Sequence, residues 1–237
     1  MKLIGLAGPA GVGKDTVADY LVETHNFTKF SFSDALYDEV ATAYGMSKAS
    51  LYDRDTKELP MLALAPKFCQ DWDFVQVLEA QGFALNQPIS PRRILQLWGT
   101  DYRRAQDPMY WIKQAALFAH AWLQVQQATI DEGNEPKAGL VNASVRFDNE
   151  CQFITQNKGE VWHILRGGLT ERLGDPSASN YVSEQPRVPG PDDKVIDNNG
   201  NIDQLRTCTS LLLGAPPGTQ LRCAPVPFNP VEHEQTK

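Results

Sequence analysis

The sequence predicts an α/β fold in which a mainly parallel β-sheet lies between two layers of helices. Two observations predict this class. Short apolar runs typical of buried strands alternate with segments of helical periodicity along most of the chain. At the N-terminus, an apolar strand is followed directly by a glycine-rich turn and a helix. The length of 237 residues fits one domain of ordinary size.

The N-terminal half begins with a strand–helix–strand unit. Residues 2–7 predict a buried strand, and residues 15–22 repeat apolar side chains at helical spacing. Residues 27–32 predict a second strand, and a helix is expected from Ser33 or Asp34 to about Tyr44. From residue 47 onward the periodicity weakens and prolines interrupt it. This stretch predicts a helical and irregular insertion.

Two helices are expected next. Pro91 suits the first turn of a helix over residues 92–104, and Asp107-Pro108 begins a second helix over residues 109–127. An apolar stripe predicts the buried face of the second helix; it comprises Trp111, Ala115, Phe118, Ala119 and Trp122.

Strands and helices alternate again in the C-terminal half. Residues 139–145 and 159–165 predict strands on either side of a helix over residues 150–156. A short strand over residues 194–196 and a helix over residues 202–213 complete the expected fold.

Composition excludes several classes of protein. The net charge of −7 argues against a protein that coats nucleic-acid phosphates, so no nucleic-acid partner is expected. Glutamine and histidine interrupt the longest uncharged helical stretch, residues 114–130, so no membrane partner is expected either. The chain starts in an apolar strand with no basic leader, and its four cysteines are widely spaced without a CxxC pair. These features favour a cytoplasmic protein.

Residues 8–14, GPAGVGK, fit the pattern GxxxxGK. Glycines allow the backbone to turn its N–H groups toward an anion, and the following helix adds positive potential. Lys14 supplies a mobile charge for the β- and γ-phosphates of a nucleotide. The motif and its context predict a phosphate-binding P-loop and a P-loop three-layer sandwich; the alternative is a glycine turn that merely precedes a helix.

Asp15 stands where such loops usually carry a serine or threonine hydroxyl that ligates Mg²⁺. The carboxylate is expected either to hold the metal through water or to cap the helix. Thr16, the next residue, has a role in the loop or is a helix-surface residue.

A second acidic candidate is Asp148, which follows the strand over residues 139–145. The carboxyl end of a strand in an open α/β sheet faces the crevice where ligands bind. The alternative is helix capping by Asp148 or Asn149. Arg146 is interpreted as a phosphate ligand, against the alternative of a surface salt bridge.

Arginines outside the loop suggest phosphoryl transfer. A closing lid over residues 166–191 with Arg166, Arg172 and Arg187 would exclude water and neutralise charge; the alternative is an ordinary solvent loop. Arg103 and Arg104 are candidates for an acceptor's phosphate. Trp98 is interpreted either as a stacking platform for a base or as core packing.

With these residues in view, the chain resembles the phage-type deoxynucleoside monophosphate kinases of the P-loop NMP-kinase group. The matching segments occur in family order over residues 1–213: GKDT at 13–16, FSFSDAL at 30–36, LQLWGTD at 95–101, VRFDNE at 145–150, SE at 183–184 and VIDNNGNIDQL at 195–205. Asn180 and Tyr181 stand where many relatives carry a histidine. The tail, residues 214–237, has no counterpart in the family.

The resemblance implies transfer of the ATP γ-phosphate to a deoxynucleoside monophosphate, with ATP and Mg²⁺ as cofactors and small-molecule nucleotides as substrates. It implies these roles: cofactor binding by Ala10, Gly11, Val12, Gly13, Lys14, Asp15 and Thr16; catalysis by Lys14, Arg146, Arg166 and Arg172; acceptor binding by Asp34, Trp98, Thr100, Asp101, Arg104 and Arg146; metal binding by Asp15 and Asp148. Residues 195–198 would lie near adenine.

The expected organisation is a single kinase domain over residues 1–213, with an acceptor-binding helical insertion at 47–107, the lid at 166–191 and a Pro-rich tail. Relatives are often dimers, so a homodimer is one expectation. Alternatives are another small-molecule P-loop kinase of the dephospho-CoA or phosphomevalonate kinase type, or a non-catalytic nucleotide-sensing protein. A nucleic-acid-processing ATPase is least favoured.

Overall fold

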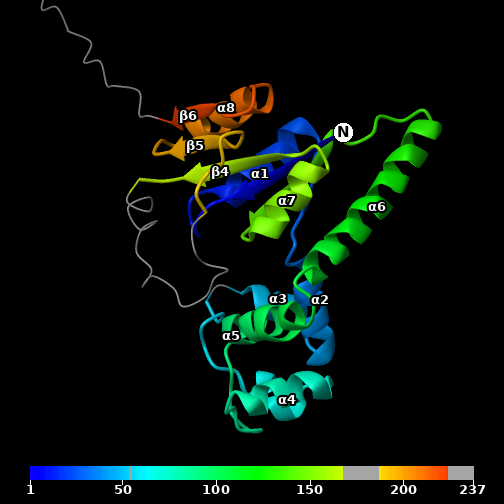
Figure 1. The fold of residues 1–237 in the computed structure, drawn as a ribbon, viewed down its shortest axis with the longest axis vertical. Helices are drawn as coiled ribbons and strands as arrows, with labels where there is room; N and C mark the ends of the chain where they lie inside the picture. Colours follow the sequence, from blue (N-terminus) through cyan, green and yellow to red (C-terminus); the bar gives the residue numbers. More distant parts are fainter. Residues whose placement is uncertain (54, 168–186, 224–237) are drawn as a thin grey trace, which may run out of the picture. The chain divides into compact units, whose positions relative to one another are not determined.

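The computed structural model describes residues 1–53, 55–167 and 187–223 (Figure 1). The chain divides into two compact units. The sheet unit comprises residues 1–29, 138–147 and the described residues from 154 on; the helical unit comprises residues 30–137 and 148–153. Most of the expected lid, residues 168–186, and most of the tail, residues 224–237, lie outside the described residues.

The sheet has six strands in the order β2-β3-β1-β4-β5-β6. Their bounds are β1 Lys2–Ala7, β2 Phe27–Phe30, β3 Gly139–Val145, β4 Glu160–Leu165, β5 Lys194–Asn198 and β6 Gln220–Cys223. Parallel pairings join β1 to β3 and β4, β4 to β5, and β5 to β6. The predicted fold class, α/β with a mainly parallel sheet, is confirmed.

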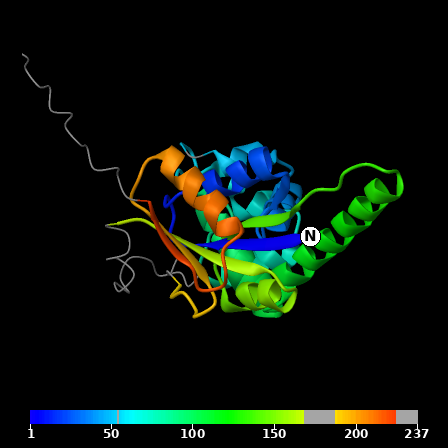
Figure 2. The same cartoon turned by 90° about the horizontal axis from the view of Figure 1, so that it is seen from above.

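Helices cover both faces of this sheet. Ile4 and Leu6 of β1 lie in one apolar core with residues of α1 (Lys14–His25) and α8 (Ile202–Leu213). Side chains alternate along a strand, so Gly5 faces the other way. There it meets Ile154 of α7 (Asp148–Gln156): a Cβ on Gly5 would lie 2.1 Å from the Ile154 Cδ1 atom. Helix α8, orange in Figure 2, thus packs with α1 on one face of the sheet, and Ile154 packs on the other, so the sheet lies between two layers.

The helical unit has its own apolar core. Its elements are α2 Asp34–Ala43, α3 Lys48–Tyr52, η1 Leu62–Leu64, η2 Pro66–Phe68, α4 Trp72–Ala80, α5 Pro91–Gln96, η3 Leu97–Arg104 and α6 Tyr110–Asp131. Buried residues from most of these elements form one cluster, including Val40, Leu51, Phe74 and Trp98. Side chains cap three of the helices: Ser47 accepts from the Ala49 amide, Asp71 from the Phe74 amide and Ser90 from the Arg93 amide.

The helix expected over residues 92–104 changes form part-way. It is α-helical to Gln96 and then becomes the π-helix η3. Within η3, the Gly99 carbonyl accepts a hydrogen bond from the Trp111 indole at 3.0 Å. A side chain that takes a helix carbonyl disturbs the regular i→i−4 ladder, which accounts for the irregular winding.

Two further expectations differ from the structure. Residues 220–223 of the tail form β6 and pair with β5, although four residues that include a charge give little strand signal. Phe118, expected on the buried stripe, is 43% exposed, and one face of its ring stacks on Phe30. Within the described ranges, no helix is long and apolar enough to span a membrane.

Candidate functional site: the glycine loop and the helical unit

The loop between β1 and α1, residues 8–13, adopts backbone angles that favour glycine. Gly8, Gly11 and Gly13 have φ values of 138°, 78° and 107°. A Cβ on Gly8 would also lie 2.2 Å from the Ile164 carbonyl oxygen, so no larger residue fits there. Gly13 is the N-cap of α1, and no side chain caps that helix end. The first turn of α1 therefore has backbone donors that no capping side chain satisfies, as an anion-binding loop requires.

Lys14 folds back over this loop. Its Nζ donates to the carbonyl oxygens of Gly8 at 2.7 Å and Pro9 at 2.6 Å. Burial and, to a lesser degree, the positive charge of Arg146 lower the pKa of Lys14 to about 8, even though Asp15 partly offsets them. The positive charges of Lys14 and Arg146 lie near each other, which favours the binding of a polyanion between them.

Register explains why Arg146 is near the loop. In the parallel pair of β1 and β3, Ala7 lies opposite Val145. Arg146 therefore leaves β3 beside Gly8, at the carboxyl edge of the sheet. The structure thus brings together two of the residues expected to hold phosphate, Lys14 and Arg146.

Asp15 lies on the exposed side of the first turn of α1. Its carboxylate forms an ion pair with Lys29 at 3.0 Å, and Lys29 also contacts Asp19 at 2.8 Å. Because no side chain caps α1, the capping alternative for Asp15 is not what the structure has. Thr16 is half-buried in the same turn.

Asn198, the last residue of β5, is a contact of the loop that the motif does not reveal. Its side chain is 4% exposed, and its Nδ2 donates to the Val12 carbonyl at 2.8 Å. The next residue, Asn199, accepts a hydrogen bond from the Gly167 amide at 2.5 Å. Arg166, one of the expected lid arginines, immediately precedes Gly167 and is exposed; Arg172 lies outside the described residues.

Several expected acceptor residues lie on η3 in the helical unit. Trp98 is only 1% exposed; its indole donates to Glu39 at 2.8 Å and its ring packs on Phe74. Thr100 and Asp101 are half-buried on the following turn.

The remaining candidates in this unit have polar contacts of their own. Arg104 pairs with Glu150 of α7 at 2.5 Å, and Glu150 is 2% exposed. Burial lowers the pKa of Arg104, although Glu150 opposes that shift. Asp34 accepts from the Ser31 amide at 2.7 Å, at the start of α2. Asp148 begins α7 and is exposed.

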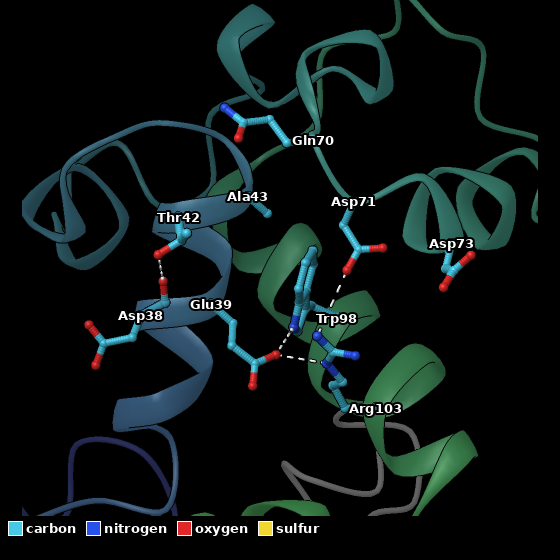
Figure 3. Close-up of a pocket in the computed structure, with 9 residues that line it drawn as sticks. All are labelled: Asp38, Glu39, Thr42, Ala43, Gln70, Asp71, Asp73, Trp98 and Arg103. Carbon is cyan, nitrogen blue, oxygen red and sulfur yellow. Dashed lines mark hydrogen bonds and ion pairs between the residues drawn. The ribbon is translucent and has the colours of Figure 1, made fainter.

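A pocket of about 620 Å³ lies beside Trp98, between α2, α4 and η3 (Figure 3). It is lined by Asp38, Glu39, Thr42, Ala43, Gln70, Asp71, Asp73, Trp98 and Arg103. Arg103, its one cation, already pairs with Glu39 at 2.7 Å and lies 3.8 Å from Asp71. With four carboxylates against one paired guanidinium, this pocket repels a phosphate monoester. The phosphate of the expected acceptor is therefore not expected to bind in this pocket.

No cluster of three or more His, Cys, Asp or Glu side chains suited to a metal ion occurs among the residues that the structure describes. Asp15 and Asp148, the expected metal residues, lie in the first turns of α1 and α7.

Comparison with known proteins identifies relatives. No family model matches the chain. It is 28% identical over 208 residues to a protein of Acanthamoeba polyphaga mimivirus named "Putative deoxynucleotide monophosphate kinase", with 86% of this chain and 92% of the relative covered. It is 26% identical over 246 aligned positions to the deoxynucleotide monophosphate kinase of Enterobacteria phage T4, with 86% and 95% covered.

The chain is thus similar over most of its length to two viral proteins with this kinase name. The resemblance to the phage-type kinases, inferred from the order of short segments, is thereby confirmed. Because 86% of this chain is aligned and both kinase sequences are covered almost end to end, the likeness is not confined to one short motif.

Proposed function

We propose that this protein transfers the γ-phosphoryl group of ATP to a deoxynucleoside monophosphate, forming the diphosphate and ADP for DNA precursor synthesis. The coarser statement, that it is a kinase of nucleotide metabolism, follows from its similarity to these two proteins. The observation that carries the proposal is the glycine loop, where Lys14 and Arg146 hold two positive charges beside uncapped backbone donors. This arrangement is suited to the triphosphate of a nucleotide.

In this proposal the backbone of residues 10–16 binds the ATP phosphates, and Lys14 changes partners. Its Nζ now contacts two neutral carbonyls, and the anionic oxygens of the β- and γ-phosphates are stronger acceptors. Phosphate oxygens next to Lys14 would raise its pKa again. Nucleotide binding would therefore offset the free-energy cost of burying the charged amine.

Oxygen ligands suit Mg²⁺, and we propose the exposed carboxylates Asp15 and Asp148 as its candidate ligands. Mg²⁺ supplies charge neutralisation on the phosphates when bound. Asp15 would exchange Lys29 for a water of the metal shell, while Thr16 offers a hydroxyl in the same turn.

The transfer itself requires alignment more than acid–base chemistry. An oxygen of the acceptor's phosphate, already anionic, attacks the γ-phosphorus; the bond from that phosphorus to the bridging oxygen breaks, and ADP leaves with the electron pair. We propose that Arg146, Arg166 and Arg172 neutralise the moving group. No strong general base is needed.

We further propose that the acceptor is bound by residues of the helical unit, Asp34, Thr100, Asp101 and Arg104, while Trp98, which is 1% exposed, packs in the core of the same unit. Arg104 is the cation of this set that lies outside the acidic pocket, so it is assigned to the acceptor phosphate. Its partner Glu150 would hold the guanidinium in position, and the two opposite charges of this ion pair add no net charge. We propose that the protein acts in the host cytoplasm, which supplies both ATP and Mg²⁺.

The direct test is ADP production from ATP and Mg²⁺ with dAMP, dGMP, dCMP, dTMP and hydroxymethyl-dCMP, beside the ribonucleotides, dephospho-CoA and no acceptor. Turnover that depends on a deoxynucleotide supports the proposal and gives the base range. Turnover with dephospho-CoA alone, or ATP binding with no turnover for any acceptor, would contradict it.

A further inference from the structure

The inference concerns Asn198 and the shape of the glycine loop. Resemblance alone placed residues 195–198 near adenine. In the structure the Asn198 side chain instead points at the loop, where its amide donates to the Val12 carbonyl at 2.8 Å. Val12 and Asn198 are both buried, at 0% and 4% exposure, so water does not compete for this hydrogen bond.

This contact fixes one particular peptide group. A peptide plane carries its C=O and the following N–H on opposite sides. With the Val12 carbonyl directed at Asn198, the Gly13 N–H is directed away from it, to the other side of the loop. If the peptide turned over, the carbonyl would face the bound anion and one backbone donor would be lost.

Gly13 and Asn198 also fit each other sterically. A Cβ on Gly13 would lie 2.8 Å from Asn198 Nδ2 and 3.3 Å from Leu205 Cδ2, and its φ of 107° already favours glycine. The space beside the loop is therefore filled by the asparagine amide and α8. Asn198 is itself held firmly, because β5 pairs with β4 on one side and with β6 on the other, where Asn198 lies opposite Cys223.

We propose that Asn198 is a positioning residue that holds the Val12–Gly13 peptide in the orientation that binds phosphate. The inference rests on the proposed function only in that the loop binds a nucleotide's phosphates. It assigns Asn198 to the phosphate end of ATP and not to its base.

The test compares ATP with inorganic tripolyphosphate, which has the phosphates but no base. The variants are Asn198→Leu, which keeps the volume but has no donor, and Asn198→Asp, which keeps the shape but cannot donate when ionised. Calorimetry in Mg²⁺ gives the Kd of each ligand for the full chain. Both affinities are expected to fall about 10-fold to 100-fold, the range that follows from the loss of one buried hydrogen bond.

The matched control is Asn201→Asp. It adds the same charge near the same end of β5 but retains an N-cap acceptor for the Gln204 amide, so both affinities are expected to stay within about twofold of the original values. Circular dichroism and Tm confirm folding. If Asn198→Asp does not fold, Asn198→Leu carries the test.

The outcomes separate the two roles. Equal losses for ATP and tripolyphosphate, with the Kd of the deoxynucleotide unchanged, support the proposal. A loss for ATP alone would place Asn198 at the base and overturn it, as would unchanged affinities for both ligands. Failure of the proposed function looks different: the unaltered protein would then bind both ligands but show no transfer to any deoxynucleotide.

Discussion

At the scale of single residues, the charge on Lys14 links pH to nucleotide binding. Burial and Arg146 lower its pKa to about 8, so the unliganded protein loses this positive charge as the pH rises through that value. ATP binds the protonated form better, so its affinity is expected to be constant below about pH 7 and to fall about tenfold per pH unit above 8.

Calorimetric titration of ATP from pH 6.5 to 9.5 measures this dependence. Lys14→Ala serves as the control, because a variant without the amine binds more weakly and shows no such decline over the same range. A decline of the same slope in Lys14→Ala would assign the titration to another group. The variant is also expected to have no measurable turnover.

Arg146 gives a second prediction at this scale. If its guanidinium contacts the phosphoryl group in transit, Arg146→Ala lowers kcat by roughly two to four orders of magnitude. Steady-state kinetics with ATP and the preferred deoxynucleotide measures kcat and KM separately. Arg92→Ala, which removes an exposed arginine paired with Glu58, is the control and should leave both constants unchanged. A change confined to KM would reassign Arg146 to ground-state binding.

Residue patterns show what sequence can and cannot reveal. The glycine loop, Lys14 and Arg146 were predictable because the motif is contiguous and parallel strands end at one edge of a sheet. Asn198 was not, since an asparagine before Asn199-Gly200 has the appearance of an ordinary turn residue. Its role depends on β5 lying close to the loop, a proximity that only the assembled sheet provides.

At the scale of elements, Glu39 joins α2 to η3 and α6. Its carboxylate accepts hydrogen bonds from Trp98, Arg103 and Tyr110. Burial, together with Glu39, raises the pKa of Tyr110 to about 12, so the phenol remains a donor across the working range of pH. The Glu39 carboxylate thus accepts hydrogen bonds from two elements that lie about sixty to seventy residues further along the sequence.

Glu39→Ala should therefore destabilise the helical unit by about 2–3 kcal/mol, because three partly buried donors lose their acceptor at once. Urea unfolding followed by tryptophan fluorescence measures the change. Glu58→Ala removes an exposed carboxylate paired with Arg92 and should cost less than about 1 kcal/mol. Equal effects of the two variants would show that the Glu39 contacts contribute little.

Elements differ in how well their sequences predict them. The strands of the sheet unit are short apolar runs, and five of the six were expected at nearly their observed positions. In the helical unit, η3 departs from α-helix because Trp111 bonds to the Gly99 carbonyl, an interaction across twelve residues of sequence. Such a contact leaves the periodicity of residues 92–104 unchanged, so the pattern predicts one continuous helix.

At the scale of the whole molecule, each of the two units has its own apolar core and one expected ligand site. The apolar core of the sheet unit contains residues of β1, α1 and α8, whereas the apolar core of the helical unit contains Phe74 and Trp98. The glycine loop belongs to the first unit and the expected acceptor residues on η3 to the second. Each ligand should therefore protect a different part of the chain from local opening.

Hydrogen–deuterium exchange with each ligand alone tests this division. A non-hydrolysable ATP analogue with Mg²⁺ is expected to slow exchange in residues 8–17 and around residue 198, and the preferred deoxynucleotide to slow it in residues 97–104. Lys14→Ala should lose the first protection and keep the second, because its change is confined to the loop. Protection of the sheet unit alone by the deoxynucleotide would move the acceptor site away from η3, and the roles given to Thr100, Asp101 and Arg104 would fall with it.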